Sequence, residues 1–209
     1  MNNKKALIGI ITRSSISESN HPIKIIYRDL ESAIEKSGGI PLGVSNESFK
    51  NYLDICDGFI LEGGSDLDPN NYPIIKYLWN KNIPLLAICL GMQEMATTFS
   101  SSEVSVSSHQ NTTHKIHLHD NTTLYKILKT HHITVNSRHS SSITPPTLTV
   151  SASSEDGTIE AIEDPEKSFF IGLQFHPENI YEDNLHAKLI FDYFIQMCQN
   201  YKYSKNNKR

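Results

Sequence analysis

A cysteine with small neighbours stands where nucleophilic chemistry would need it. Cys89 directly follows the apolar run Pro84–Ile88, and Gly91 lies two positions further on. A strand that ends at a nucleophile, with a helix starting at the next residue, is typical of a nucleophile elbow. The free N–H groups and the dipole of such a helix stabilise a thiolate. Taken alone, the pattern also fits a buried core cysteine, because free cysteines are among the most buried residues.

A second motif supplies a partner for this cysteine. The run Phe169–Gln174 predicts a strand, and His176, Pro177 and Glu178 come just after it. Pro177 cannot donate a hydrogen bond to a sheet, so the chain should leave the sheet at this point. A cysteine paired with a histidine that a carboxylate orients is an arrangement used in nucleophilic catalysis. We therefore interpret Cys89, His176 and Glu178 as a catalytic triad.

Two consecutive glycines provide a third feature of the same kind. Gly63 and Gly64 come after the apolar run Gly58–Leu61, at the end of another predicted strand. Glycines there let the backbone approach a substrate and aim an N–H group at a developing oxyanion. Open α/β sheets place their sites at the carboxyl ends of their strands. We expect the three features to meet there, although two glycines alone would also fit a simple turn.

The order of the predicted elements indicates the fold class. In the first half of the chain, apolar runs alternate with helix-like segments. The runs are Ala6–Thr12, Ile40–Val44, Gly58–Leu61 and Pro84–Ile88, and the helix-like segments are Pro22–Ser37, Pro73–Lys81 and Leu90–Phe99. This alternation predicts an α/β fold in which a mostly parallel central sheet carries helices on both faces.

The second half of the chain predicts a small antiparallel extension of that sheet. Short strands are expected at Lys115–Leu118, Ile133–Val135, Leu148–Ala152, Ile159–Ile162 and Phe169–Gln174, with helices at Thr122–Lys129 and Leu185–Met197. The serine-rich segment Ser100–Ser108 predicts a flexible loop. We expect a single domain over residues 1–200 and a flexible basic tail over residues 201–209.

Composition argues against several functional classes. The chain has 209 residues, which suits one domain, and a net charge of −4. No basic face for nucleic-acid binding is expected, because the chain without residues 201–209 carries a net charge of −8. No apolar run approaches the ~20 residues of a membrane span, and no signal peptide is recognised. Three cysteines form no disulfide framework, so we expect a reducing cytoplasm.

The histidines raise the question of a metal site. Seven of them fall between residues 109 and 139, namely His109, His114, His117, His119, His131, His132 and His139. A zinc site is conceivable, but no carboxylate or cysteine keeps a ligand spacing with them. In a strand, His114 would also point away from the face that His117 and His119 share. The sequence therefore predicts no metal, and His114 is interpreted as a surface histidine.

The chain resembles the class I glutamine amidotransferase superfamily. Three motifs carry the resemblance: LEGGSD at 61–66, AICLGMQ at 87–93 and GLQFHPE at 172–178. Four more are similar to the γ-glutamyl-γ-aminobutyrate hydrolase branch, also called peptidase C26: IGIITR at 8–13, GGIP at 38–41, GGSDLDP at 63–69 and VNSRH at 135–139. The resemblance spans nearly the whole chain and implies a flavodoxin-like fold.

The resemblance also implies a role for each site residue. Cys89 would be the nucleophile, His176 the general base and acid, and Glu178 the residue that orients the histidine. The N–H groups of Gly64 and Leu90, next to Gly63, would form the oxyanion hole. The residues implied to hold the glutamyl part of the substrate or to line its pocket are Gln93, Asn136, Ser137 and His139.

The implied activity is a cysteine-dependent hydrolysis of γ-glutamyl amides without a cofactor. It would release glutamate and an amine through a γ-glutamyl thioester. One alternative is a glutaminase subunit that supplies ammonia to a synthase or ligase partner, and another is a γ-glutamyl hydrolase in a nucleotide-sugar or capsule pathway. Leu90 replaces the arginine common in the branch, and the segment after Pro69 is shorter. The sequence therefore does not determine the identity of the leaving amine, or whether the chain has a synthase partner or forms a homodimer. The intact triad disfavours a binding module without catalytic activity.

Overall fold

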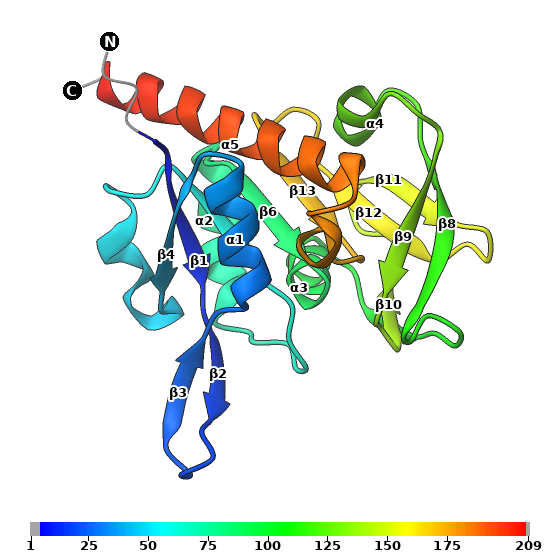
Figure 1. Ribbon diagram of the computed structural model, residues 1–209, viewed down its shortest axis with the longest axis horizontal. Helices are drawn as coiled ribbons and strands as arrows, with labels where there is room; N and C mark the ends of the chain where they lie inside the picture. Colours follow the sequence, from blue (N-terminus) through cyan, green and yellow to red (C-terminus); the bar gives the residue numbers. More distant parts are fainter. Residues whose placement is uncertain (1–4, 208–209) are drawn as a thin grey trace.

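One sheet of nine strands organises the protein, and a computed structural model describes residues 5–207 (Figure 1). The strands lie side by side in the order β4 (Ile40–Val44), β1 (Leu7–Ile11), β5 (Gly58–Leu61), β6 (Leu85–Ile88), β13 (Phe170–Leu173), β12 (Ile159–Glu163), β11 (Thr149–Ser154), β8 (Thr112–Leu118) and β9 (His132–Ser137). The first five are parallel, and the last four add to them in antiparallel pairs. The predicted α/β fold is confirmed.

The parallel half has the strand order of flavodoxin-like folds. Numbered along the chain, its five strands are arranged 2-1-3-4-5. Every residue of β5, β6 and β13 is buried, as expected for parallel strands that are covered on both faces. The carboxyl ends of these three strands lie side by side, because β5 pairs with β6 and β6 pairs with β13. The three predicted site motifs come directly after these ends.

Helices cover both faces of the sheet. On one face, α1 (Arg28–Lys36), α4 (Thr123–Leu128) and α5 (Leu185–Asn206) contribute to a single apolar core. On the other face, α2 (Asn71–Asn80), α3 (Leu90–Thr98) and the 3₁₀ helix η1 (Asn46–Tyr52) contribute to a second core. The predicted strands and helices lie where they were expected apart from the three segments described next, although their ends shift by a few residues.

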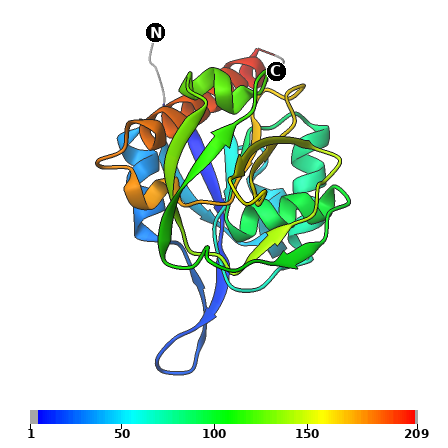
Figure 2. The ribbon, with the colours of Figure 1, turned by 90° about the vertical axis from the view of Figure 1, so that its right-hand side faces the viewer.

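The expected helix over Pro22–Ser37 is wrong in its first part. Pro22–Ile25 is strand β3, which pairs antiparallel with β2 (Arg13–Ile16), and helix α1 begins only at Arg28. The β-branched Ile23 and Ile25 favour a strand over a helix. Figures 1 and 2 show this hairpin extending away from the body of the protein.

The other two corrections concern segments expected to be flexible. Part of the serine-rich segment forms β7 (Glu103–Ser105), which pairs with β10 (Ser141–Ile143). Helix α5 continues to Asn206, so the expected flexible tail is wrong for residues 201–206, while residues 208–209 lie outside the described residues. Lys202 Nζ and Lys205 Nζ each lie 3.1 Å from a carboxylate oxygen of Asp57. This buried acid needs cationic partners and thereby anchors the helix end.

No helix within residues 5–207 is both long and apolar enough to cross a membrane.

Candidate active site

Cys89 occupies a sharp turn between β6 and α3. Its backbone has φ 52° and ψ −108°, in the left-handed half of conformational space that non-glycine residues rarely adopt. Its N–H group donates a 2.7 Å hydrogen bond to the Leu173 carbonyl at the end of β13. A Cβ atom at Gly91 would collide with the Leu61 carbonyl, so only glycine lets α3 pack this closely on β5. This geometry is a sharp strand-to-helix turn, the kind of turn that the sequence predicts at Cys89.

His176 and Glu178 meet just beyond the end of β13. The chain leaves the sheet into the 3₁₀ helix η2 (Pro177–Ile180), and His176 Nδ1 lies 2.7 Å from Glu178 Oε1. Asn136, on β9, holds the histidine backbone from both sides. Its Nδ2 donates to the His176 carbonyl at 2.9 Å, and its Oδ1 accepts from the His176 N–H at 3.1 Å. The imidazole is therefore fixed by its side chain and by its backbone.

Electrostatic interactions favour the charged form of this histidine. Burial by itself lowers the pKa of His176, but the hydrogen bonds to Cys89 and Glu178 outweigh burial and raise it to about 10. Both partners therefore favour the imidazolium form of His176. An imidazolium beside a cysteine favours the reactive thiolate.

The two glycines pack directly against His176 and Leu90. A Cβ atom at Gly63 would lie 3.0 Å from His176 Cε1, and one at Gly64 would lie 2.9 Å from Leu90 Cδ2. Larger residues would therefore displace the groups that they face. Leu90 is the first residue of α3, where N–H groups have no acceptor within the helix. The loop and the helix start thus approach each other next to Cys89.

A buried ion pair anchors the glycine loop. Arg13 Nη1 lies 2.6 Å from Glu94 Oε1 on α3, and the Arg13 Nε–H is shared between the carbonyls of Glu62 at 3.1 Å and Gly63 at 3.2 Å. Glu94 is completely buried. Sequence reasoning missed this pair, although Glu94 is the single charged residue of the segment Leu90–Thr98, which was a signal for it.

These groups line a small cavity of about 220 Å³. It brings together the predicted triad and both predicted glycines with three residues that sequence reasoning missed. The lining residues are Tyr27, Gly63, Gly64, Cys89, Arg138, His176, Glu178 and Asn179. Arg138 is exposed and, among the described residues, has no hydrogen-bond or ion-pair partner. Its guanidinium is available for a carboxylate of a bound molecule.

Gln93 lies behind the cavity rather than on its lining. Its Nε2 donates to Gln174 Oε1 at 3.2 Å and to the Ser141 carbonyl at 3.1 Å. Gln174 Nε2 in turn lies 3.7 Å from Cys89 Sγ, within hydrogen-bond distance for sulfur. Gln93 therefore reaches Cys89 through Gln174, which sequence reasoning did not single out.

The other three predicted pocket residues also lie outside the lining of this cavity. Asn136 holds the backbone of His176, as described above. Ser137 Oγ donates a 2.5 Å hydrogen bond to the His109 carbonyl. His139 Nδ1 lies 3.0 Å from the Ser141 carbonyl, and its other ring nitrogen faces Glu160. The structure therefore places all three in supporting positions.

Comparison with known proteins identifies the family. The sequence pattern of the peptidase C26 family matches residues 6–76 and 71–178. The chain belongs to the peptidase C26 family. It is thereby a member of the class I glutamine amidotransferase superfamily, as its motifs predicted.

Two curated relatives and one solved structure illustrate this membership. The chain is 24% identical to the γ-glutamyl-γ-aminobutyrate hydrolase PuuD of Escherichia coli K12, over 87% of this chain and 89% of that protein. It is 28% identical to a glutamine-hydrolysing GMP synthase subunit of Methanothrix thermoacetophila, over 91% and 98% respectively. The glutaminase domain of Trypanosoma brucei CTPS has the same fold, with a TM-score of 0.74, 17% identity and coverage of 91% and 94%. Such relatives support an enzyme of the glutamine amidotransferase or γ-glutamyl hydrolase kind.

Proposed function

We propose that this C26 family member is a cysteine-dependent hydrolase of γ-glutamyl amides. The observation that carries the proposal is that Cys89, His176 and Glu178 meet on the wall of the 220 Å³ cavity, where His176 Nδ1 lies 2.7 Å from Glu178 Oε1. In the first half-reaction, the Cys89 thiolate attacks the γ-carbonyl carbon. The oxyanion that develops accepts hydrogen bonds from the N–H groups of Gly64 and Leu90. His176 then protonates the leaving amine, the C–N bond breaks and a γ-glutamyl thioester forms.

The second half-reaction returns the enzyme to its starting state. Neutral His176 takes a proton from water, and the resulting hydroxide attacks the thioester carbonyl. The C–S bond breaks, glutamate leaves, and Cys89 is again a thiolate beside an imidazolium. Glu178 stays ionised throughout, holding the imidazole orientation and stabilising its charge. These steps use only groups of this chain and water.

The sizes of two neighbouring cavities suggest where the two parts of a substrate bind. A cavity of about 220 Å³ is smaller than the ~300–1,000 Å³ typical of sites for whole ligands. We therefore assign the glutamyl unit to it, with its α-carboxylate on Arg138. A neighbouring cavity of about 440 Å³ shares Tyr27 and Gly64 with the first and is assigned to the leaving amine. The cavity wall would be held in place by residues behind it, which would therefore affect substrate binding indirectly: Gln93, Asn136, Ser137 and His139.

The test is a substrate screen with a matched pair of variants. Purified full-length protein is incubated with glutamine and a panel of γ-glutamyl amines, and the release of glutamate is measured. Cys89→Ala should abolish release, whereas Cys56→Ala should not alter it, because Cys56 is buried away from the cavity. A folded Cys89→Ala protein that still releases glutamate would show that the mechanism is wrong.

A second candidate function is a glutaminase that delivers ammonia to a synthase partner. The likeness to a glutamine-hydrolysing GMP synthase subunit favours it, and so does Leu90, which replaces the arginine common in the γ-glutamyl hydrolase branch. The same screen separates the two, since a glutaminase of this kind should accept glutamine but not bulkier γ-glutamyl amines. We also propose a cytoplasmic location, which the three free cysteines support.

A further inference from the structure

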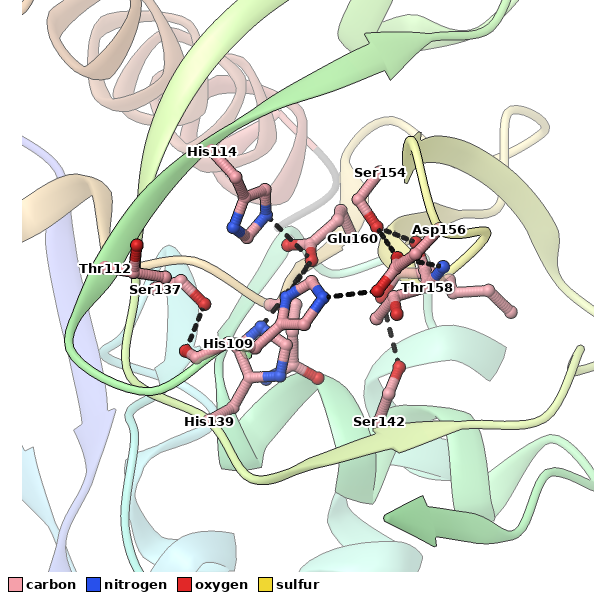
Figure 3. A network of polar contacts seen from close by, with 12 residues as sticks. His109, Thr112, His114, Ser137, His139, Ser142, Ser154, Asp156, Thr158 and Glu160 are labelled. Atoms are coloured by element: carbon pink, nitrogen blue, oxygen red, sulfur yellow. Dashed lines mark hydrogen bonds and ion pairs between the residues drawn. The ribbon is translucent and has the colours of Figure 1, made fainter. Parts of the chain in front are cut away.

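A second polar cluster lies outside the active-site cavity, and a buried glutamate stands at its centre. Glu160, on β12, is completely buried. Its Oε1 atom faces three imidazole nitrogens: His114 Nε2 at 3.1 Å, His109 Nδ1 at 3.4 Å and His139 Nε2 at 3.5 Å (Figure 3). His114 comes from β8, His109 from the segment before it and His139 from the segment after β9. No carboxylate keeps a ligand spacing with these histidines along the sequence, but the fold supplies one from a distant strand.

Hydrogen bonds on the far side of two rings determine where their protons lie. His109 Nε2 is 2.9 Å from Asp156 Oδ2, and His139 Nδ1 is 3.0 Å from the Ser141 carbonyl. Both partners are acceptors, so these two nitrogens carry protons. In a neutral ring, the remaining nitrogen then aims a lone pair at Glu160 Oε1. Both nitrogens, His109 Nδ1 and His139 Nε2, are buried without a hydrogen-bond partner.

Acceptors that face one another in a buried place require a cation between them. It is either an additional proton on each ring or a metal ion shared by the donors. We propose that His109 Nδ1, His114 Nε2 and Glu160 Oε1 bind one Zn²⁺ ion, while His139 Nε2 lies 3.5 Å from the same oxygen. The three ligand atoms lie within 4.8 Å of one another. Imidazole nitrogens with one carboxylate oxygen are a donor set that zinc favours.

The distances around Glu160 suit this ion. Zinc bonds of ~2.0–2.1 Å in a tetrahedron place neighbouring ligand atoms about 3.3 Å apart. The separations of 3.1 and 3.4 Å from Glu160 Oε1 to the two histidine ligands already have this length. Asp156 would hold His109 in its ligating tautomer, as carboxylates do behind zinc-bound histidines. A surface cavity lined by His109, His114 and Asp156 gives the ion a path from solvent.

The ion would join segments that support the catalytic wall. The Glu160 carbonyl accepts from the N–H of Gln174, whose side chain contacts Cys89. The His109 carbonyl accepts from Ser137 Oγ on β9. We therefore assign the ion a structural role, and the assignment does not depend on which amide the enzyme hydrolyses.

Zinc binding by the full-length protein tests the proposal directly. After removal of metals with a chelator, calorimetric titration with Zn²⁺ should show one ion bound per chain. The affinity should fall as the pH is lowered and the imidazoles become protonated. His114→Asn, at a partly exposed ligand, should abolish the stoichiometric site, and Asp156→Asn should weaken binding by ~10–100-fold. Circular dichroism of each variant verifies that it is folded.

A second group of histidines provides the matched control. On strands β8 and β9, the His117 and His132 rings lie 5.0 Å apart, and both side chains are exposed. The variant His117→Asn/His132→Asn should bind Zn²⁺ as the native protein does. The proposal is overturned if the native protein binds no zinc, if folded His114→Asn binds it equally well, or if this control variant loses the site. In the first case, the buried glutamate would be neutralised by imidazolium protons instead.

Discussion

Removing the charge of Glu94 should weaken the fold and the active site together. Glu94 Oε1 accepts from Arg13 Nη1 at 2.6 Å and from the Asp68 N–H at 2.9 Å, and its Oε2 accepts from Asn71 Nδ2 at 3.0 Å. Glu94→Gln keeps the shape but leaves the guanidinium of Arg13, which is only 8% exposed, without a counter-charge. Breaking a buried pair costs ~3–5 kcal/mol. We expect the lower end of about 3 kcal/mol, because Arg13 keeps its bonds to two carbonyls.

Urea unfolding followed by circular dichroism measures this loss. A decrease of about 3 kcal/mol corresponds to a melting temperature lower by ~6–12 °C for a chain of this size. The control is Glu47→Gln, since Glu47 pairs with Lys24 on the surface and should have little effect. The double variant Arg13→Met/Glu94→Gln should be less destabilised than the sum of its single variants, because no unpaired guanidinium is left.

The same variant links stability to catalysis. Arg13 binds the carbonyls of Glu62 and Gly63, so a shift of its guanidinium after the loss of the Glu94 charge should carry this loop with it and move the N–H of Gly64 away from the oxyanion. Well below the melting temperature, kcat should therefore fall while the protein is still folded. Two results would refute the reasoning: a Glu94→Gln protein as stable as the native one, or single variants whose effects simply add.

Three further predictions concern the catalytic groups. Burial raises the pKa of Cys56 to about 12 and that of Cys198 well above its usual range. Brief treatment with iodoacetamide at neutral pH should therefore label Cys89 first, which peptide mapping can verify. His176→Ala should lose ~10²–10⁴-fold in kcat, whereas Glu178→Gln should retain more activity, and equal losses would give Glu178 a larger role. Because the pKa of His176 is raised from 6.5 to about 10, the ion pair should stabilise the fold fully below pH 6.5 and lose that effect as the pH rises through about 10. The alkaline limb of kcat/KM should lie near that upper value, and a limb near pH 6.5 would contradict the assigned ion pair.

Features that depend on neighbouring residues could be predicted from the sequence. The elbow requires an apolar strand, Cys89 and Gly91 in succession, and all of these lie within one short stretch. His176 and Glu178 are two positions apart, so a single turn brings them together. The helix expected from Pro22 failed for a related reason. Its apolar spacing fits a helix, but β3 pairs with residues of β2 that the local pattern does not include.

Features that depend on distant residues were missed. Glu94 meets Arg13 from 81 positions away, and Asn136 meets His176 from 40. Glu160 lies 46 positions from His114 in the sequence, so ligand spacing along the chain could not detect it. The predicted helix ended too early, at Met197, because the last residues of α5 are polar. Their anchor is Asp57, a buried acid far away in the sequence, just before β5.

The backbone of Cys89 shows why this site needs so many supports. A residue at φ 52° and ψ −108° costs roughly 1–3 kcal/mol and persists only where its surroundings determine it. Here the Cys89 N–H is held by Leu173 on β13, and its carbonyl accepts from the N–H of Gln93 in the first turn of α3. The absent side chain of Gly91 lets that helix start against β5. Three adjacent parallel strands thus hold one strained residue, and the strain lifts its sulfur out of the sheet to face His176.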